Sequence, residues 1–334
     1  MDIGSRSRST AQDVAERAGV SRAAVSRCFN ARGRVSGDKR ERILAAASEL
    51  GYRPNAIARS LTGQPTDLVA LITTESLGYQ SNEQLRAITL CLAERGKRAL
   101  IIPVGAKTTL DESSLRALDY QVDAIVVMGG SISRHVVELL AAARVPLLLF
   151  GRAHEGAGTA AICCDNAEGG AIAARCLTRL GRTRLAYVGK SAGTFADRAR
   201  LGGFVGELRR QGLEPCDMAA DESSFAGGRR AAATLLAAAE PPDGLFCFND
   251  TVAFGALQAA RDFRLRVPED VAIVGFDDQP MAAWPAFDLT TVGCDSGALA
   301  ELAAAKILAA LGRGEQVEGT FLVRPYLVVR GTTP

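Results

Sequence analysis

From residue 64 onward, the chain alternates between short apolar runs and longer amphipathic segments rich in Ala and Leu. A strand followed by a helix, repeated with short connections, is typical of a parallel α/β sheet. The expected strands are "LVALIT", "RALIIPV", "AIVVM", "PLLLF", "AAICC", "RLAYVG", "GLFCF" and "VAIVGF". These units suffice for two sheets. No GxGxxG motif opens the first unit and no GxxxxGK[ST] motif occurs, so a nucleotide-binding fold is not supported.

The first 63 residues have a different pattern. Two short apolar-periodic segments in "DVAERAGVSRAAVSRCFN" (13–30) are joined by Gly-Val-Ser. Thr10 and Asp13 have the spacing of a capping box, Gly19 can end the first helix, and Ser21 can cap the second. This short connection containing Gly indicates a helix-turn-helix. From this stretch alone, an ordinary αα-hairpin of a helical bundle is the alternative.

A third helix is expected after Ser36, in "GDKRERILAAASEL". Its predicted buried stripe is Ile43, Leu44, Ala47 and Leu50. Asn55 can then cap a short helix over 56–62. Two turns of helix are unstable alone in water because nucleation is costly, so this segment needs a partner chain or a ligand.

Charge separates the two parts of the chain. Residues 1–63 hold 12 Lys and Arg against 6 Asp and Glu, a net charge of +6. The remaining residues hold 27 against 31, a net charge of −4. A basic head on a mildly acidic body indicates a polyanionic partner for the head alone.

The eight cysteines show no CxxC spacing, and the two histidines, His135 and His154, lie far apart in the sequence. We therefore expect free thiols in a reducing, cytoplasmic compartment and no metal or other cofactor. The N-terminal "MDIGSRSRST" has no apolar core of the kind a signal peptide needs, and no run approaches the ~20 apolar residues of a membrane span.

The head resembles the DNA-binding domain of the LacI-type (lactose and galactose repressor) family of transcription regulators. The similarity runs through "DVAERAGVSRAAVSRCFN", "VS" and "RERILAAASELGYRPNAIARSL". It implies that the second helix enters the major groove and that the segment after Asn55 is a hinge helix, folded on cognate DNA and paired with its twin. The positions implied to contact DNA are Thr10, Ser21, Arg22, Ala23, Ser26, Arg27, Asn30, Asn55, Arg59 and Leu61.

Three of these positions have particular roles by that resemblance. Arg22 can donate two hydrogen bonds to guanine, whereas Ala23 can contact only a thymine methyl group. Leu61 matches the residue that wedges between base steps in the minor groove and kinks the duplex. For each arginine of the head, a solvated surface charge is the alternative to a DNA contact.

The body resembles the periplasmic-binding-protein-like core that follows the head in this family. The matching segments are "DNAEGG", "RARLGGF", "DGLFCFNDTVAFGAL", "VPEDVAIVGFDD" and "LTTV". We expect a helix-turn-helix domain over 1–54, a hinge and linker over 55–65, and a two-lobed core over 66–334. Lobe one should cover about 66–163 and 294–322, and lobe two about 164–293 and 323–334.

The resemblance also implies an effector site between the lobes, where ligands bind in open α/β folds. Arg200, Asn249 and Asp277 match residues that bond the ligand's polar groups. Phe225 matches an aromatic residue that stacks on its apolar face, and Tyr79 matches an aromatic residue of the first loop. Asn249 is equally well explained as the cap of the helix that follows it.

Three departures from the family pattern affect this site. Leu77-Gly78-Tyr79-Gln80 replaces Asn-Pro-Phe-Phe in the first loop, and Cys294 replaces a common Gln. A loop in which some sugar-binding members have an acidic residue reads "GRAHEG", with Arg152 and His154. We therefore expect a sugar acid or sugar phosphate ahead of a neutral sugar.

The expected function is a ligand-controlled repressor of carbohydrate or sugar-acid catabolic genes. We expect a homodimer formed through lobe one and a palindromic operator. A tetramer is not expected, since no leucine heptad follows "RGTTP". One rival is a sugar-transport component, which needs a signal peptide and no basic head. Another is an enzyme using Asp165, Asp250, Asp277 or Asp278, but no nucleophile–His pair or metal set accompanies these carboxylates.

Overall fold

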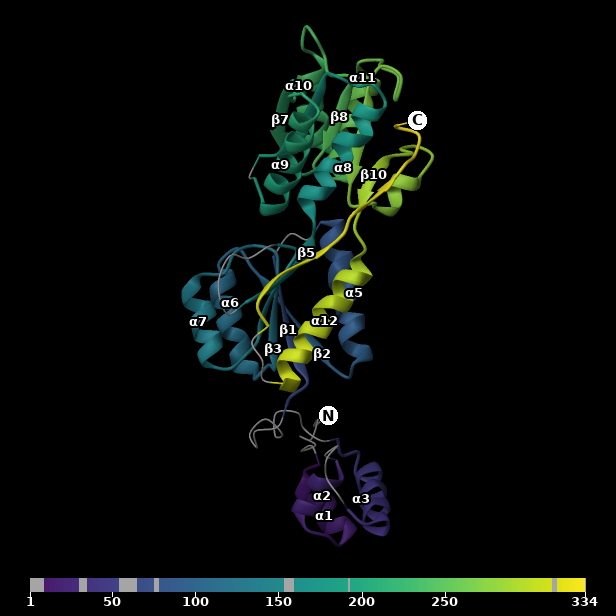
Figure 1. The fold of residues 1–334 in the computed structure, drawn as a ribbon. Coiled ribbons are helices and arrows are strands. Elements are labelled where there is room, and N and C mark those ends of the chain that lie inside the picture. Colours follow the sequence, from purple (N-terminus) through teal and green to yellow (C-terminus); the bar gives the residue numbers. More distant parts are fainter. Residues whose placement is uncertain are drawn as a thin grey trace. The chain divides into compact units, whose positions relative to one another are not determined.

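The structure, a computed structural model, describes residues 9–29, 35–53, 65–74, 78–152, 159–191, 193–313 and 317–333. The chain divides into two compact units, Met1–Thr66 and Asp67–Pro334. The first unit is helical and the second holds two six-stranded sheets (Figure 1). None of the helices in these ranges is long and apolar enough to span a membrane.

The helical unit contains α1 (Ala11–Ala18), α2 (Arg22–Cys28) and α3 (Gly37–Glu49). Their small buried side chains form one core: Val14, Ala15, Ala18, Ala24, Val25, Cys28, Ile43, Ala46 and Ala47. The predicted stripe of α3 was wrong at Leu44, which is 43% exposed. Ala46 and Ala47 lie three and four residues after Ile43 and share its face, whereas Leu44 is turned by about 100°. Ser36 precedes α3 but makes no side-chain capping bond.

The first sheet of the larger unit has the strand order β11-β5-β4-β3-β1-β2. Each pair of neighbouring strands in this order is parallel. The strands are β1 (Leu68–Thr74), β2 (Arg98–Val104), β3 (Ala124–Met128), β4 (Leu147–Phe150), β5 (Ala160–Cys164) and β11 (Gly319–Val323). The helices with it are α5 (Tyr79–Glu94), α6 (Leu110–Arg116), η1 (Ala117–Tyr120), α7 (Arg134–Ala142) and α12 (Ser296–Arg313).

Alternation along the strands divides this sheet into two buried faces. Val69 and Leu71 of β1 belong to a core that includes residues of α5 and α12. Ala70 and Ile72 belong to a core that includes residues of η1 and α7. A strand that is buried on both faces has a continuous apolar sequence. For this reason strands such as β1 could be predicted from the sequence.

The second sheet has the strand order β12-β10-β9-β8-β6-β7. In this order β12 pairs with β10 in the antiparallel sense, and the other neighbouring pairs are parallel. Its strands are β6 (Leu185–Lys190), β7 (Asp217–Asp221), β8 (Gly244–Cys247), β9 (Ala272–Phe276), β10 (Thr290–Gly293) and β12 (Tyr326–Val328). The helices are α8 (Asn166–Arg179), α9 (Phe195–Arg210), α10 (Phe225–Leu236), α11 (Asp250–Asp262) and η2 (Pro280–Ala283).

Two helix pairs cover this second sheet. Apolar residues of α8 and α9 share one core with it, and those of α10 and α11 share another. The α8–α9 pair is close because of two glycines. A Cβ on Gly170 would lie 2.0 Å from the Arg200 carbonyl oxygen, and one on Gly203 would lie 1.8 Å from the Ala167 carbonyl oxygen.

The chain passes between the two sheets three times. It leaves the first sheet at Cys164, the last residue of β5, and enters α8 of the second. After β10 of the second sheet it passes through Cys294 to α12, which packs with the first sheet. After β11 of the first sheet it passes to β12 of the second. Each sheet is therefore built from segments that are distant in the sequence (Figure 1).

Candidate functional site

One face of α2 is exposed while the opposite face is buried. Ala24, Val25 and Cys28 point into the helical core. The residues that sequence analysis assigned to DNA on this helix, Arg22, Ala23, Ser26 and Arg27, are all exposed. Because positions i, i+1, i+4 and i+5 share one side of a helix, the four side chains form a single row.

The side-chain caps that the sequence predicted at the starts of α1 and α2 are both present. Thr10 and Asp13 form a reciprocal capping box at the start of α1, and Gly19 ends α1 at a φ of +63°. The Ser21 hydroxyl accepts a hydrogen bond from the Ala24 amide at 3.2 Å. The Thr10 hydroxyl is used in both directions, because it accepts from the Asp13 amide at 3.3 Å and donates to Asp13 Oδ2 at 3.0 Å. The Ser21 hydroxyl accepts from a backbone amide, which leaves its hydrogen for an acceptor. Four other predicted DNA positions, Asn30, Asn55, Arg59 and Leu61, lie outside the described residues, as does His154.

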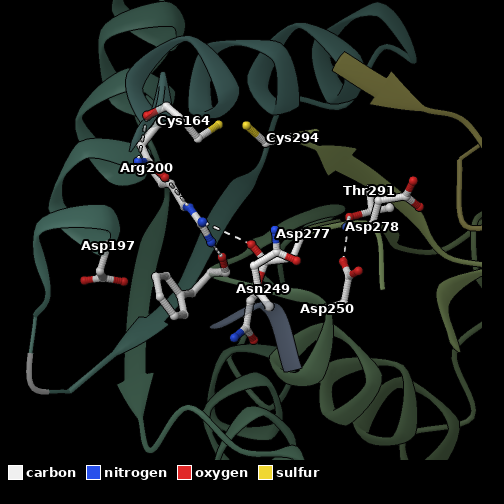
Figure 2. Close-up of polar contacts among 12 residues, drawn as sticks. Cys164, Asp197, Arg200, Asn249, Asp250, Asp277, Asp278, Thr291 and Cys294 are labelled. Atoms are coloured by element: carbon white, nitrogen blue, oxygen red, sulfur yellow. Dashed lines mark hydrogen bonds and ion pairs between the residues drawn. The ribbon is translucent and has the colours of Figure 1, made fainter. Parts of the chain in front are cut away.

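Arg200 of α9 is the centre of a buried polar cluster at the carboxyl end of the second sheet (Figure 2). Its Nε donates to Asn166 Oδ1 at 2.9 Å, and its Nη1 donates to the Phe248 carbonyl oxygen at 2.6 Å. Its Nη2 donates to Asp277 Oδ1 at 3.1 Å. The guanidinium carbon lies 3.5 Å from the centroid of the Phe276 ring, so the cation is stacked as well as bonded.

Asp277 follows β9 and has a φ of +105°, a region that L residues rarely adopt. Burial raises the pKa of its carboxyl group, and the Arg200 guanidinium opposes that rise. The side chains of Arg200 and Asp277 are 9% and 8% exposed. The pair therefore offers a donor edge beside an acceptor edge, with its two charges largely compensating each other.

The other predicted effector residues have different surroundings. Asn249 caps α11, accepting from the Val252 amide at 2.9 Å and donating to Ser223 Oγ at 3.1 Å. Phe225 and Tyr79 are the first residues of α10 and α5, and are 42% and 37% exposed. Arg152 follows β4 and donates to Ser131 Oγ at 2.6 Å. Arg200, Asp277 and Asn249 thus come from the second-sheet part, and Tyr79 and Arg152 from the first.

Sequence reasoning missed Asn166 as part of this cluster. Its amide nitrogen donates to the Cys164 carbonyl oxygen at 3.0 Å, while its oxygen accepts from Arg200. It is 4% exposed. The only signal was its place in "DNAEGG", directly after a buried strand.

Each of the four carboxylates considered for catalysis already has a partner within the protein. Asp165 caps α8 by accepting from the Glu168 amide at 3.0 Å. Asp278 pairs with Arg330 at 2.7 Å, and Asp277 pairs with Arg200. Asp250 is fully buried and accepts from the Thr291 hydroxyl at 2.5 Å and from the Gln279 amide at 2.7 Å. Within the described ranges, no group of three or more His, Cys, Asp and Glu residues could hold a metal ion.

Asp250 should make the stability of the larger unit depend on pH. Burial, followed by the neighbouring Asp277, raises its pKa well above the ordinary value. The folded state then binds this proton more tightly than the unfolded state, so stability falls as pH rises from about 4 toward the raised pKa. We expect Asp250→Asn to flatten the decline in urea midpoint between pH 5 and pH 8, since Asn has no proton to lose.

The matched control is Asp262→Asn on the same helix. Hydrogen bonds from Gln258 and Arg229 lower the pKa of Asp262, so its contribution is lost only as pH falls below the ordinary range. That variant should keep the wild-type slope between pH 5 and 8. An unchanged slope in Asp250→Asn would show that Asp250 does not titrate there.

Comparison with known proteins relates both units to one family. Residues 10–55 match "Bacterial regulatory proteins, lacI family", and residues 174–333 match "Periplasmic binding protein-like domain". The transcriptional regulator DegA of Bacillus subtilis is 30% identical over 85% of this chain and 86% of its own length.

Two solved structures are similar in fold as well as sequence. The Lac repressor dimer bound to operator and the anti-inducer ONPF superposes with a TM-score of 0.87, at 25% identity over 98% of this chain and 99% of that one. The regulator CelR in complex with cellobiose gives a TM-score of 0.70, at 26% identity over 97% and 100%.

These matches confirm the resemblance and the fold class expected from the sequence. They also confirm that the relatives are regulators rather than enzymes. The helical unit corresponds to the first of these descriptions and the two-sheet unit to the second. This chain belongs to the LacI family of bacterial transcription regulators.

Proposed function

We propose that this cytoplasmic regulator represses genes of carbohydrate or sugar-acid catabolism and is controlled by a small molecule bound between the two lobes of its core. The main support for DNA binding is one face of α2. That face is exposed at Arg22, Ala23, Ser26 and Arg27, while the other face is buried. A rigid row of two cations and two small side chains suits the major groove, where base edges are accessible.

The decisive test is an electrophoretic mobility shift with DNA upstream of the protein's own gene cluster. We expect a specific complex that unlabelled random DNA does not remove, with an affinity that falls steeply with salt as phosphate contacts release counterions. A transport component would give no specific shift. Such a result would refute the repressor proposal.

Replacing Arg22 with Ala should weaken operator binding by about 1–3 kcal/mol and relax the preference at one base position in each half-site. The reason is the loss of a paired donor to guanine. Fluorescence anisotropy on a set of singly substituted operators measures both effects.

Arg17→Ala is the control for Arg22. Arg17 is an exposed arginine of the same unit, but it lies on α1 and pairs with Glu49 at 2.7 Å. It should leave the base preference unchanged. An equal loss on every operator sequence in Arg22→Ala would make Arg22 a phosphate contact instead.

The proposed effector site centres on Arg200 and Asp277. A polyol needs donors and acceptors side by side, and the guanidinium and carboxylate provide them on one buried pair. Asn249, Phe225, Tyr79 and Arg152 complete the proposed site. The cellobiose complex of CelR supports a carbohydrate as the ligand class.

An anionic sugar is proposed ahead of a neutral one because Arg152 adds positive charge. Arg200 contributes little net attraction for an anion, since Asp277 compensates its charge. Calorimetric titration with glucose, glucuronate and glucose 6-phosphate tests this preference. Arg152→Gln should remove any preference for the charged ligands and leave neutral-sugar binding within about twofold. Tight binding of only a neutral hexose by the wild type would refute it.

We further propose a homodimer on a palindromic operator, as in the Lac repressor dimer bound to operator. Exposed apolar side chains on the first-sheet part support a partner there: Leu90 of α5 is 51% exposed and Ile101 of β2 is 48% exposed. Sedimentation velocity at micromolar concentration should give the mass of two chains.

A further inference from the structure

Two buried cysteines meet where the chain passes between its sheets. Cys164 ends β5 and Cys294 directly follows β10, and the two are 9% and 7% exposed. Figure 2 shows their sulfur atoms facing each other beside Arg200. The neighbouring Cys294 side chain is the leading cause of the raised pKa of Cys164, followed by burial. The two thiols are therefore neighbours that face each other across the junction of β5 and β10.

The two cysteines lie where the three connections between the sheets come together. Cys164 belongs to the first connection and Cys294 to the second, while the Cys294 sulfur lies 3.9 Å from the carbonyl oxygen of Val323, where the third connection begins. The Cys164 backbone also contacts the polar cluster, because its carbonyl oxygen accepts from Asn166, which in turn accepts from Arg200.

We propose that Cys164 and Cys294 form a reversible disulfide when the protein meets a hydroperoxide. One thiol, after losing its proton, attacks the peroxide oxygen, giving a sulfenic acid and releasing an alcohol or water. The second thiol then attacks that sulfur and forms the S–S bond. The sulfenic hydroxide leaves and takes up the proton of the second thiol, giving water. In sum two thiols are oxidised to one disulfide, and one hydroperoxide is reduced to an alcohol and water.

The disulfide would join the first and second connections between the sheets covalently. It closes a covalent loop around the whole segment from α8 to β10, which lowers the entropy of the unfolded chain. It also fixes the two strand ends against each other, so any rotation of one sheet relative to the other must keep that link. The oxidation of the two thiols itself does not depend on the proposed regulatory role.

The rate of oxidation is limited by burial. The thiolate is the nucleophile, and the raised pKa of Cys164 makes it scarce at neutral pH. Cys216 is exposed and is the internal reference for the same solution. We expect the linked pair to form more slowly than Cys216 is oxidised, and faster as pH rises.

The experiment treats the folded, full-length protein with hydrogen peroxide at pH 8, then alkylates free thiols and maps the peptides by mass spectrometry. The expected product is a peptide linked through Cys164 and Cys294, reversed by dithiothreitol. It should be accompanied by a rise in melting temperature of about 5–10 °C.

Three variants make the result specific. Cys164→Ser and Cys294→Ser should each lose the linked peptide and the rise in melting temperature, while Cys216→Ser should keep both. The proposal is overturned if Cys164 and Cys294 remain open to alkylation on unfolding after ten times the exposure that oxidises Cys216. It is also overturned if the link forms only in protein oxidised in urea.

Discussion

Arg200→Met should lower the free energy of unfolding of the larger unit by about 3–5 kcal/mol, the usual result of removing one member of a buried ion pair. The change leaves the Asp277 carboxylate without its cation and the Phe248 carbonyl oxygen without its donor. Trp284 is the only tryptophan of the chain and lies in this unit, so its fluorescence in urea reports unfolding there.

A double-mutant cycle identifies the cause of that loss. Asp277→Asn removes the charge and keeps a residue type that tolerates the positive φ of this position. If the stranded carboxylate is responsible, Arg200→Met combined with Asp277→Asn should be more stable than Arg200→Met alone, with a coupling of about 1–3 kcal/mol. Additive losses would instead assign the effect to packing of the guanidinium against Phe276.

Gly203→Ala and Gly202→Ala should change stability in opposite directions although the residues are neighbours in α9. A Cβ on Gly203 would lie 1.8 Å from the Ala167 carbonyl oxygen, a backbone atom of α8 that cannot turn aside. The helices must separate, at a cost of about 3 kcal/mol. Gly202 is exposed and a Cβ there would contact nothing within 4 Å, so Ala should stabilise by about 0.5–1 kcal/mol.

Urea unfolding of both glycine variants by Trp284 fluorescence measures this difference. Because Arg200 lies on α9 and bonds to Asn166 of α8, Gly203→Ala should also disturb the proposed effector site. Equal midpoints for the two variants would mean that α8 and α9 adjust to the added methyl group.

The fold was largely predictable because its signals are local. Runs such as "AIVVM" are buried at every position, and a buried strand of a parallel sheet must be apolar on both faces. β7 was missed because Asp217–Asp221 is an edge strand without a continuous apolar run and with exposed side chains such as Met218. The exposed row of α2 was predictable from its period, since the buried residues of that helix are small and apolar.

The polar cluster was only partly predictable. Family resemblance pointed to Arg200, Asn249 and Asp277 one by one, but not to the bond between Arg200 and Asp277. The bond from Arg200 to Asn166 exists because Gly170 and Gly203 let two helices approach closely, which is a property of packing rather than of either motif. The capping bond of Asn249 was predicted from the sequence, because it joins residues only three positions apart.

The threefold passage of the chain between its sheets has a consequence for biosynthesis. Leu299, Ala303 and Ile307 of α12 cover the same apolar core as Ile88 and Leu92 of α5, although most of the second sheet is translated between them. A nascent chain that has produced β1 to β5 therefore presents an uncovered apolar surface to the ribosome and its chaperones. Truncations that end before α12 should accumulate as inclusion bodies, whereas the short helical head can complete its core as soon as it emerges.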